Sequence, residues 1–346
     1  MATEANIWIS DDPLSLEYGG ELRPLQLAYH TWGTLNNRCS NVILVEHGLT
    51  ADSNARDWWG PLIGDGKLLD TSQYFVICIN CLGSPYGSTS PLTYRGNGST
   101  GYNFPKVTIR DIVHSQKKLL DHLGVQQLQT ILGPSLGGML ALEWPLLYPN
   151  FVQTTVSLGS TARHTGWHIG LSAAQREAII ADPAWKDGRY GRQQPEQGLG
   201  LARKIAMLSY RSAVSFKDRF GRHLQAEQDD YYAVESYLDY QGKKLVDRFD
   251  ANCYLALTEI MDTHDIGRGR GGHINAIQHI TLPALIISIN SDVLYPVHEQ
   301  QELVEHLPHA DYFVIDSRQG HDAFLIDFDQ IVAGITPFKE QHWHAD

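Results

Sequence analysis

A strand, a glycine-flanked serine and a helix follow one another without a break between residues 128 and 149. Residues 128–132 are apolar and β-branched enough for a short buried strand, and the pattern G-x-S-x-G centred on Ser135 follows at once. The next apolar run indicates a helix that ends at Pro149, because proline cannot continue a helix. This order is typical of a nucleophile elbow, in which glycines allow a serine to lie exposed on a tight turn. We therefore predict that Ser135 is a nucleophile; the alternative is a glycine-rich turn with an incidental serine.

Two backbone N–H groups are candidates for an oxyanion hole beside this serine. The N–H of Leu136 directly follows Ser135 and lies at the positive end of the predicted helix. The second candidate is the N–H of Leu49, in the loop after the apolar strand at 41–46. His47 lies in the same loop and is interpreted as structural, because a better-placed histidine follows later in the chain.

A serine nucleophile needs a base, and the base needs a carboxylate to orient it. Asp292 follows the apolar strand at 280–290, and His321 follows the strand at 311–316. Alone, Asp292 fits a turn and His321 fits a helix cap. Together with Ser135 they have the chain order and the loop positions of a Ser-Asp-His triad. Two other acids lie outside the expected loop and are weaker candidates for the carboxylate: Glu143 and Asp316.

Strands and helices alternate through both ends of the chain, which predicts an α/β fold with a mostly parallel sheet covered on both faces. Between these ends, strand-like runs vanish and charged helical patterns appear. We predict one α/β core in two parts, residues 1–158 and 276–346, interrupted by a helical lid, residues 159–275. The expected helices are 61–69, 108–123, 172–181, 198–216, 229–245, 252–262, 297–307 and 324–335. The expected strands are 41–46, 74–80, 128–132, 151–158, 280–290 and 311–316, after a β-rich N-terminal segment.

Composition excludes several classes of function. The formal net charge of −12 argues against a nucleic-acid partner, and no apolar run reaches the length of a membrane span. The N-terminal residues lack the basic start and apolar core of a secretion signal. Cys78 and Cys81 have C-x-x-C spacing but lie in a hydrophobic run, so we interpret them as buried thiols and expect no metal site. Free cysteines without a signal indicate the cytoplasm.

Over nearly its whole length the chain resembles the homoserine O-acetyltransferases and their close relatives, which are acyltransferases with an α/β-hydrolase fold. The helical stretches matter most, because this region differs widely among α/β-hydrolases. The matching segments are AYHTWGTLN, HGLTAD, YFVICINCLGSPYGSTSP, FPKVTIRDIVHSQKKLLDHLGV, GPSLGGMLALEW, GLGLARKIAMLSYRS, ESYLDYQGKKLVDRFDANCYLALTEIMDTHDIGRGRG, SDVLYPVHEQ and GHDAFL.

The resemblance implies a two-step reaction in methionine biosynthesis. Ser135 would take the acetyl group from acetyl-CoA with His321 as base, and the hydroxyl of L-homoserine would then take it from the enzyme. Arg203 and Tyr210 would bind the carboxylate of the amino acid, and Asp322 would bind its ammonium group. Acetyl-CoA is a co-substrate, no cofactor is expected, and the lid would form a homodimer interface.

Several loops depart from the usual pattern of this family. Residues 47–52 read HGLTAD in place of HALTGD, residues 87–91 read GSTSP in place of GSTGP, and Ser84-Pro85 replaces a glycine-cysteine pair. The elbow reads GPSLGG in place of the commoner GGSMGG. These loops line the expected pocket, so succinyl-CoA as donor and L-serine as acceptor stay open. An esterase, in which water replaces the amino acid, and a binding protein without catalysis are the further alternatives.

Overall fold

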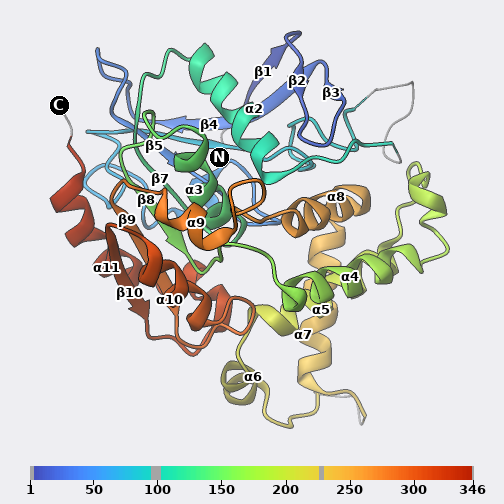
Figure 1. The fold of residues 1–346 in the computed structure, drawn as a ribbon. Coiled ribbons are helices and arrows are strands. Elements are labelled where there is room, and N and C mark those ends of the chain that lie inside the picture. The colour runs from blue at the N-terminus through green and yellow to red at the C-terminus, as the bar shows by residue number, and fades with distance from the viewer. Residues whose placement is uncertain (1–3, 95–102, 226–229, 345–346) are drawn as a thin grey trace.

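The computed structural model describes residues 4–94, 103–225 and 230–344 and contains one eight-stranded sheet (Figure 1). The first two strands in spatial order are antiparallel to their neighbours, and from β6 onward all neighbours are parallel. The predicted α/β-hydrolase fold is thereby confirmed. In spatial order the strands are β1 (Asn6–Ser10), β4 (Leu25–Trp32), β6 (Phe75–Ile79), β5 (Val42–Val45), β7 (Leu128–Pro134), β8 (Thr155–Leu158), β9 (Ala284–Ile289) and β10 (Ala310–Ile315). A separate pair joins β2 (Leu14–Ser15) to β3 (Glu21–Leu22).

Alternate residues of the strands point to opposite faces of the sheet, and helices bury both faces. In β6, Ile77 and Ile79 pack on the side of α2 (Ile109–His122) and α3 (Leu136–Leu147). Val76 and Cys78 of the same strand belong to the cluster that contains α1 (Ala55–Trp59) and α11 (Phe328–His342). A third cluster packs α10 (Val297–His306) near β9. The C-x-x-C thiols are buried and free, as predicted, and burial raises their pKa well above the usual range.

All the helices between β8 and β9 belong to one long insertion. Figure 1 shows α4, α5, α6 and α7 grouped away from the sheet, with α8 beside them. Gly200 and Gly242 allow α5 and α7 to approach closely, because a Cβ on Gly242 would lie 2.9 Å from the Gly200 carbonyl oxygen. The exact ends of the predicted lid, residues 159 and 275, stay a prediction. The helices are α4 (Gly166–Ile180), η2 (Lys186–Gly188), α5 (Glu196–Tyr210), α6 (Ala213–Phe220), α7 (Ala233–Val246), α8 (Ala251–Asp262) and α9 (His273–Gln278).

The helix predicted at 61–69 is wrong, since helix α1 ends at Trp59 and turns follow. The carboxylate of Asp70 accepts backbone N–H groups from Gly66, at 3.0 Å, and from Ser72, at 2.9 Å. Gly66 also has a positive φ of 68°. Side-chain bonds of this kind compete with helix formation and favour turns.

The single helix predicted at 198–216 is in fact two helices, α5 and α6. The chain is extended at Arg211, with φ −113° and ψ 151°. Ser212 then starts a new helix, because its hydroxyl accepts the N–H of Ser215 at 3.0 Å, as an N-cap does. The helix predicted from 229 is α7, and residue 229 itself lies outside the described residues.

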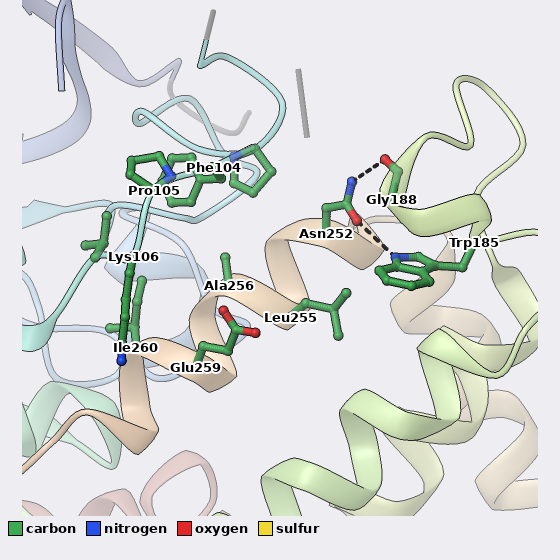
Figure 2. A pocket seen from close by; sticks show the side chains of 12 residues that line it. Phe104, Pro105, Lys106, Trp185, Gly188, Asn252, Leu255, Ala256, Glu259 and Ile260 are labelled. Carbon is green, nitrogen blue, oxygen red and sulfur yellow. Dashed lines mark hydrogen bonds between the residues drawn. The ribbon is translucent and has the colours of Figure 1, made fainter. Parts of the chain in front are cut away.

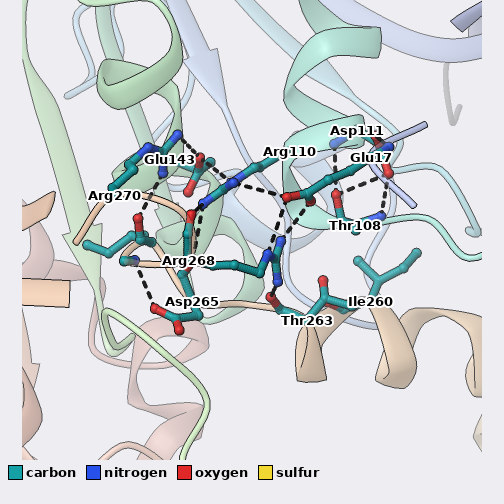
Figure 3. Close-up of polar contacts among 12 residues, drawn as sticks. Glu17, Thr108, Arg110, Asp111, Glu143, Ile260, Thr263, Asp265, Arg268 and Arg270 are labelled. Carbon is teal, nitrogen blue, oxygen red and sulfur yellow. Dashed lines mark hydrogen bonds and ion pairs between the residues drawn. The ribbon is translucent and has the colours of Figure 1, made fainter. Parts of the chain in front are cut away.

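An ion-pair network joins the C-terminal part of the insertion to the core (Figure 3). Glu143 of α3, whose side chain is 2% exposed, pairs with Arg270 at 2.5 Å and with Arg110 of α2 at 3.1 Å. Glu17 pairs with Arg110 at 3.0 Å and with Arg268 at 2.7 Å. Glu143, a weaker candidate for the catalytic carboxylate, is therefore committed to structural ion pairs. Among the described residues, no helix has the length and apolar character needed to cross a membrane.

Candidate active site

Ser135 lies between β7 and α3 on a strained turn, with φ 57° and ψ −121°. Positive φ is rare for residues other than glycine, and it is typical of a nucleophile elbow. The turn packs directly on the backbone at the end of β5. A Cβ on Gly133 would lie 2.7 Å from the carbonyl oxygen of Glu46, and a Cβ on Gly137 would overlap the same oxygen. The two glycines of the motif are therefore required by backbone contact, which explains the spacing seen in the sequence.

The structure brings Asp292 and His321 together although they lie in different loops. Nδ1 of His321 is 2.6 Å from Oδ2 of Asp292, and the two side chains are 3% and 0% exposed. Oδ1 of Asp292 accepts the backbone N–H groups of Leu294, at 2.8 Å, and Tyr295, at 3.0 Å. A carboxylate held in this way orients the ring of His321 and presents Nε2 as the free nitrogen.

Nε2 of His321 is buried and has no hydrogen-bond partner among the described residues. The hydrogen bonds of the described residues include none between Ser135 and His321. Gly159 lies beside both partners of the pair, since a Cβ there would be 3.6 Å from Oδ2 of Asp292 and 3.6 Å from Cε1 of His321. The loop after β8 therefore completes a wall of the site.

The two predicted oxyanion donors lie on either side of the contact between β5 and the elbow. Leu49 follows β5, Leu136 is the first residue of α3, and neither backbone N–H donates to another described residue. His47 holds the Leu49 loop, since Nδ1 lies 2.9 Å from the Gly48 carbonyl and Nε2 accepts the N–H of Cys81 at 3.1 Å. Both ring nitrogens are occupied, in agreement with a structural role for His47.

The residues predicted to bind the amino acid gather beside His321. The ring of Tyr210 lies 5.9 Å from that of His321, and the guanidinium carbon of Arg203 lies 5.3 Å from the Tyr210 ring. Burial raises the pKa of the neighbouring Asp322, while Arg211 and Arg203 act in the opposite direction. The nearest cation to Asp322 is Arg211, which forms an ion pair with it at 3.1 Å.

Sequence reasoning missed two residues of this region, Arg211 and Tyr295. Arg211 follows Tyr210 at the end of α5 and binds the loop of His321, with Nη1 2.7 Å from Oε1 of Gln319. The available signal was its position beside a predicted substrate-binding tyrosine. Tyr295 lies three positions after Asp292, and its ring is 5.2 Å from that of His321. No local sequence pattern marks its side chain as part of the site.

A small pocket of about 30 Å³ lies beside these groups, lined by Leu49, Tyr210, Tyr295 and residues of α4 and α8. A volume of this size holds about two water molecules, and neither Ser135 nor His321 is among the residues that line it. Figure 2 shows a separate pocket of about 160 Å³, bordered by Lys106, Trp185 and residues of α8. None of the predicted site residues lines this second pocket.

Comparison with known proteins agrees with this geometry. Residues 41–328 match the family model described as alpha/beta hydrolase fold. The homoserine O-acetyltransferase of Chloroherpeton thalassium is 48% identical over 332 residues, which cover 95% of this chain and 87% of that protein. The crystal structure of homoserine O-acetyltransferase from Bacillus anthracis superposes with a TM-score of 0.91, at 27% identity and 99% coverage of both chains. An acetylester hydrolase from Corynebacterium glutamicum gives a TM-score of 0.87 at 25% identity, covering 98% of this chain and 95% of the other. The chain therefore belongs to the homoserine O-acetyltransferase family of α/β-hydrolase-fold proteins.

Proposed function

We propose that this chain transfers the acetyl group of acetyl-CoA to the hydroxyl of L-homoserine, a step of methionine biosynthesis. The observation that most supports this is the paired Asp292 and His321 beside the Ser135 elbow, in a chain that matches homoserine O-acetyltransferases over nearly its full length. The similarity to homoserine O-acetyltransferases supports acetyl as the transferred group.

Each half of the reaction uses the same three side chains. In the first, His321 removes the proton of Ser135, the serine oxygen attacks the thioester carbonyl, and the protonated His321 returns the proton to the leaving thiolate of CoA. In the second, His321 removes the proton of the homoserine hydroxyl, whose oxygen attacks the acetyl-serine ester, and the protonated His321 returns the proton to the leaving oxygen of Ser135. The N–H groups of Leu49 and Leu136 would stabilise the oxyanion in both halves.

The amino acid would be held at its two charged ends. Arg203 offers paired N–H donors for the carboxylate and Tyr210 offers a hydroxyl, while Asp322 offers a carboxylate for the ammonium group. The contacts that support this assignment are the short separations of Arg203 from Tyr210 and of Tyr210 from His321. Acetyl-CoA is the co-substrate, and we propose that the reaction needs no cofactor.

We also propose that the enzyme is a cytoplasmic homodimer that pairs through its helical insertion. Three large apolar side chains on α5 and α7 support this interface: Leu201, 49% exposed, Leu208, 56% exposed, and Tyr240, 61% exposed. Light scattering tests the proposal, and a monomer at micromolar concentration would contradict it. A Leu208→Asp variant should shift the protein towards monomer if the interface uses this face.

The likeness to an acetylester hydrolase favours a second candidate function, ester hydrolysis. Incubation with acetyl-CoA, with and without L-homoserine, separates the two. Release of CoA that requires homoserine and gives O-acetylhomoserine supports transfer, whereas equal release without homoserine, with formation of acetate, supports hydrolysis. The same assay with succinyl-CoA and with L-serine tests the choice of donor and acceptor.

A further inference from the structure

The loop that carries Asp292 is held from outside by two side chains of the helical insertion. Nε1 of Trp167 donates to the carbonyl oxygen of Val293 at 3.0 Å, and Nε2 of His168 lies 2.9 Å from the carbonyl oxygen of Leu294. Trp167 and His168 are consecutive residues in the first turn of α4. Two neighbouring residues of the insertion therefore hold two neighbouring residues of the core.

The same two peptide units hold the carboxylate of Asp292. The Val293 carbonyl shares a peptide unit with the N–H of Leu294, which donates to Oδ1 of Asp292 at 2.8 Å. The Leu294 carbonyl shares a peptide unit with the N–H of Tyr295, which donates to the same oxygen at 3.0 Å. A peptide unit is planar, so a side chain that fixes its carbonyl also fixes the direction of its N–H. The two α4 side chains consequently fix the direction of both N–H groups that bind Asp292.

The hydrogen bonds of His168 determine which of its ring nitrogens carries the proton. Nδ1 accepts the backbone N–H of Thr165 at 3.0 Å, so the proton lies on Nε2, which donates to the Leu294 carbonyl. The carboxylate of Glu299 is farther away, with its Oε2 3.6 Å from Nε2. Burial lowers the pKa of His168 to about 3, so the ring is neutral at pH 7. His168 is therefore a fixed donor to the loop of Asp292.

The ring of His168 is itself confined by its neighbours. Its side chain is 0% exposed, and its ring is stacked 4.8 Å from that of His164 and 4.8 Å from that of Tyr295. Nε2 of His164 lies 3.0 Å from the hydroxyl of Tyr295, which links these two rings as well. A ring packed in this way has little room to turn, so its donor keeps one direction.

We propose that His168 is a positioning residue that acts on His321 through Asp292. Its Nε2–H fixes one of the two peptide units that hold the Asp292 carboxylate. Trp167 fixes the other less firmly, because Trp167 is 52% exposed and water can replace its N–H. The proposal rests on the proposed role of Asp292 as the catalytic acid and does not depend on which acyl donor or acceptor is used. Since α4 belongs to the insertion, the insertion helps to set the reactivity of the core.

The rate at which a fluorophosphonate labels Ser135, followed by intact-protein mass spectrometry, tests this proposal. His168→Phe keeps an aromatic ring and removes the donor, so labelling should be about threefold to tenfold slower, the effect of losing one ordinary hydrogen bond. His168→Gln is the matched control, since its amide offers a donor and an acceptor, as the neutral ring does. Its labelling rate should stay within about twofold of that of the unaltered enzyme. An unchanged rate in His168→Phe, or an equal loss in both variants, would overturn the proposal.

A role that acts through Asp292 also predicts how these substitutions combine with Asp292→Ala. Once the carboxylate is gone, the peptide units have nothing to orient, so adding His168→Phe should slow labelling by less than about twofold more. Trp167→Phe extends the test to an exposed position, where the core stays intact. It should slow labelling about twofold to threefold in the unaltered enzyme and leave the rate of Asp292→Ala unchanged.

Equal losses in the two backgrounds would contradict the proposal, because they would show that His168 and Trp167 act independently of the carboxylate. Labelling of Asp292→Ala alone at the rate of the unaltered enzyme is a different failure. It would refute the proposed role of Asp292 as the catalytic acid, and this proposal with it, whether or not homoserine-dependent release of CoA is observed.

Discussion

Asp322 and Arg211 form an ion pair that joins the loop of the proposed base to the end of α5, with Oδ2 of Asp322 3.1 Å from Nε of Arg211. Both side chains are 16% exposed, so the pair is shielded from most solvent. If Asp322 also binds the substrate ammonium, its negative charge is shared between Arg211 and the amino acid. Asp322→Asn would remove that charge and keep the shape of the side chain.

We expect Asp322→Asn to raise the KM for homoserine by about tenfold or more, since a charge-assisted hydrogen bond is lost. The KM for acetyl-CoA should change little. Steady-state kinetics with each substrate varied in turn measures both values. Asp218→Asn is the matched control, because Asp218 pairs with Arg318 of the same loop at 2.9 Å but in an exposed position. Equal effects of the two substitutions would contradict a role for Asp322 in binding the ammonium group.

Ser135→Ala should abolish both acetyl transfer and labelling by a fluorophosphonate, because no other side chain occupies the elbow. The turn keeps its backbone strain in the variant, so circular dichroism should show an unchanged fold. Residual homoserine-dependent release of CoA above the uncatalysed rate would mean that acetyl passes directly from CoA to the amino acid, without an acyl-enzyme.

Asp292→Asn should lower kcat by about 10³-fold to 10⁴-fold, because an amide no longer holds His321 in the required tautomer. Asp316→Asn provides the comparison, since Asp316 was a rival candidate for the carboxylate. In the structure, Oδ1 of Asp316 instead accepts a hydrogen bond from the side-chain amide of Asn290 at 2.5 Å, in an exposed position. Measurement of kcat for the two variants decides between the two acids, and a larger loss in Asp316→Asn would refute the assignment of Asp292.

The sequence predicted those features that depend on local pattern and chain order. The elbow was predictable because backbone contact at Gly133 and Gly137 demands glycine, and the pairing of Asp292 with His321 because each follows one of two adjacent parallel strands, β9 and β10. The break at Ser212 carried a local signal, an N-cap serine, that the apolar spacing concealed. The contacts of Arg211 with the His321 loop were not predictable, since the partners Arg211 and Gln319 lie 108 positions apart.

Glu46 provides a prediction for the dependence of stability on pH. Burial raises the pKa of its carboxyl group from 4.5 to about 8, and the hydrogen bond that it accepts from the Gln116 amide at 2.8 Å acts against this increase. Between about pH 4.5 and pH 8, the folded protein therefore keeps a proton on Glu46 that the unfolded chain has already released. This contribution to stability is complete below about pH 4.5 and is lost as the pH rises towards about 8.

Denaturant unfolding of the unaltered protein and Glu46→Gln between pH 5 and pH 8 should reveal this loss. The free energy of unfolding of the unaltered protein should fall, relative to the variant, by up to about 1.4 kcal/mol for each pH unit. Glu305→Gln, at an exposed position of α10, should show no such trend. A constant difference between Glu46→Gln and the unaltered protein across this range would show that Glu46 does not titrate there.

The contact of Glu46 with Gly133 and Gly137 also limits how this enzyme can diversify. Backbone contacts backbone there, so the spacing of the two proposed oxyanion donors does not depend on a side chain that a mutation could replace. New preferences for a longer acyl chain or another amino acid must then arise on the opposite wall, where α4, α5 and α8 present replaceable residues. Directed evolution of substrate range should accumulate its mutations in those helices and spare the end of β5 and the elbow.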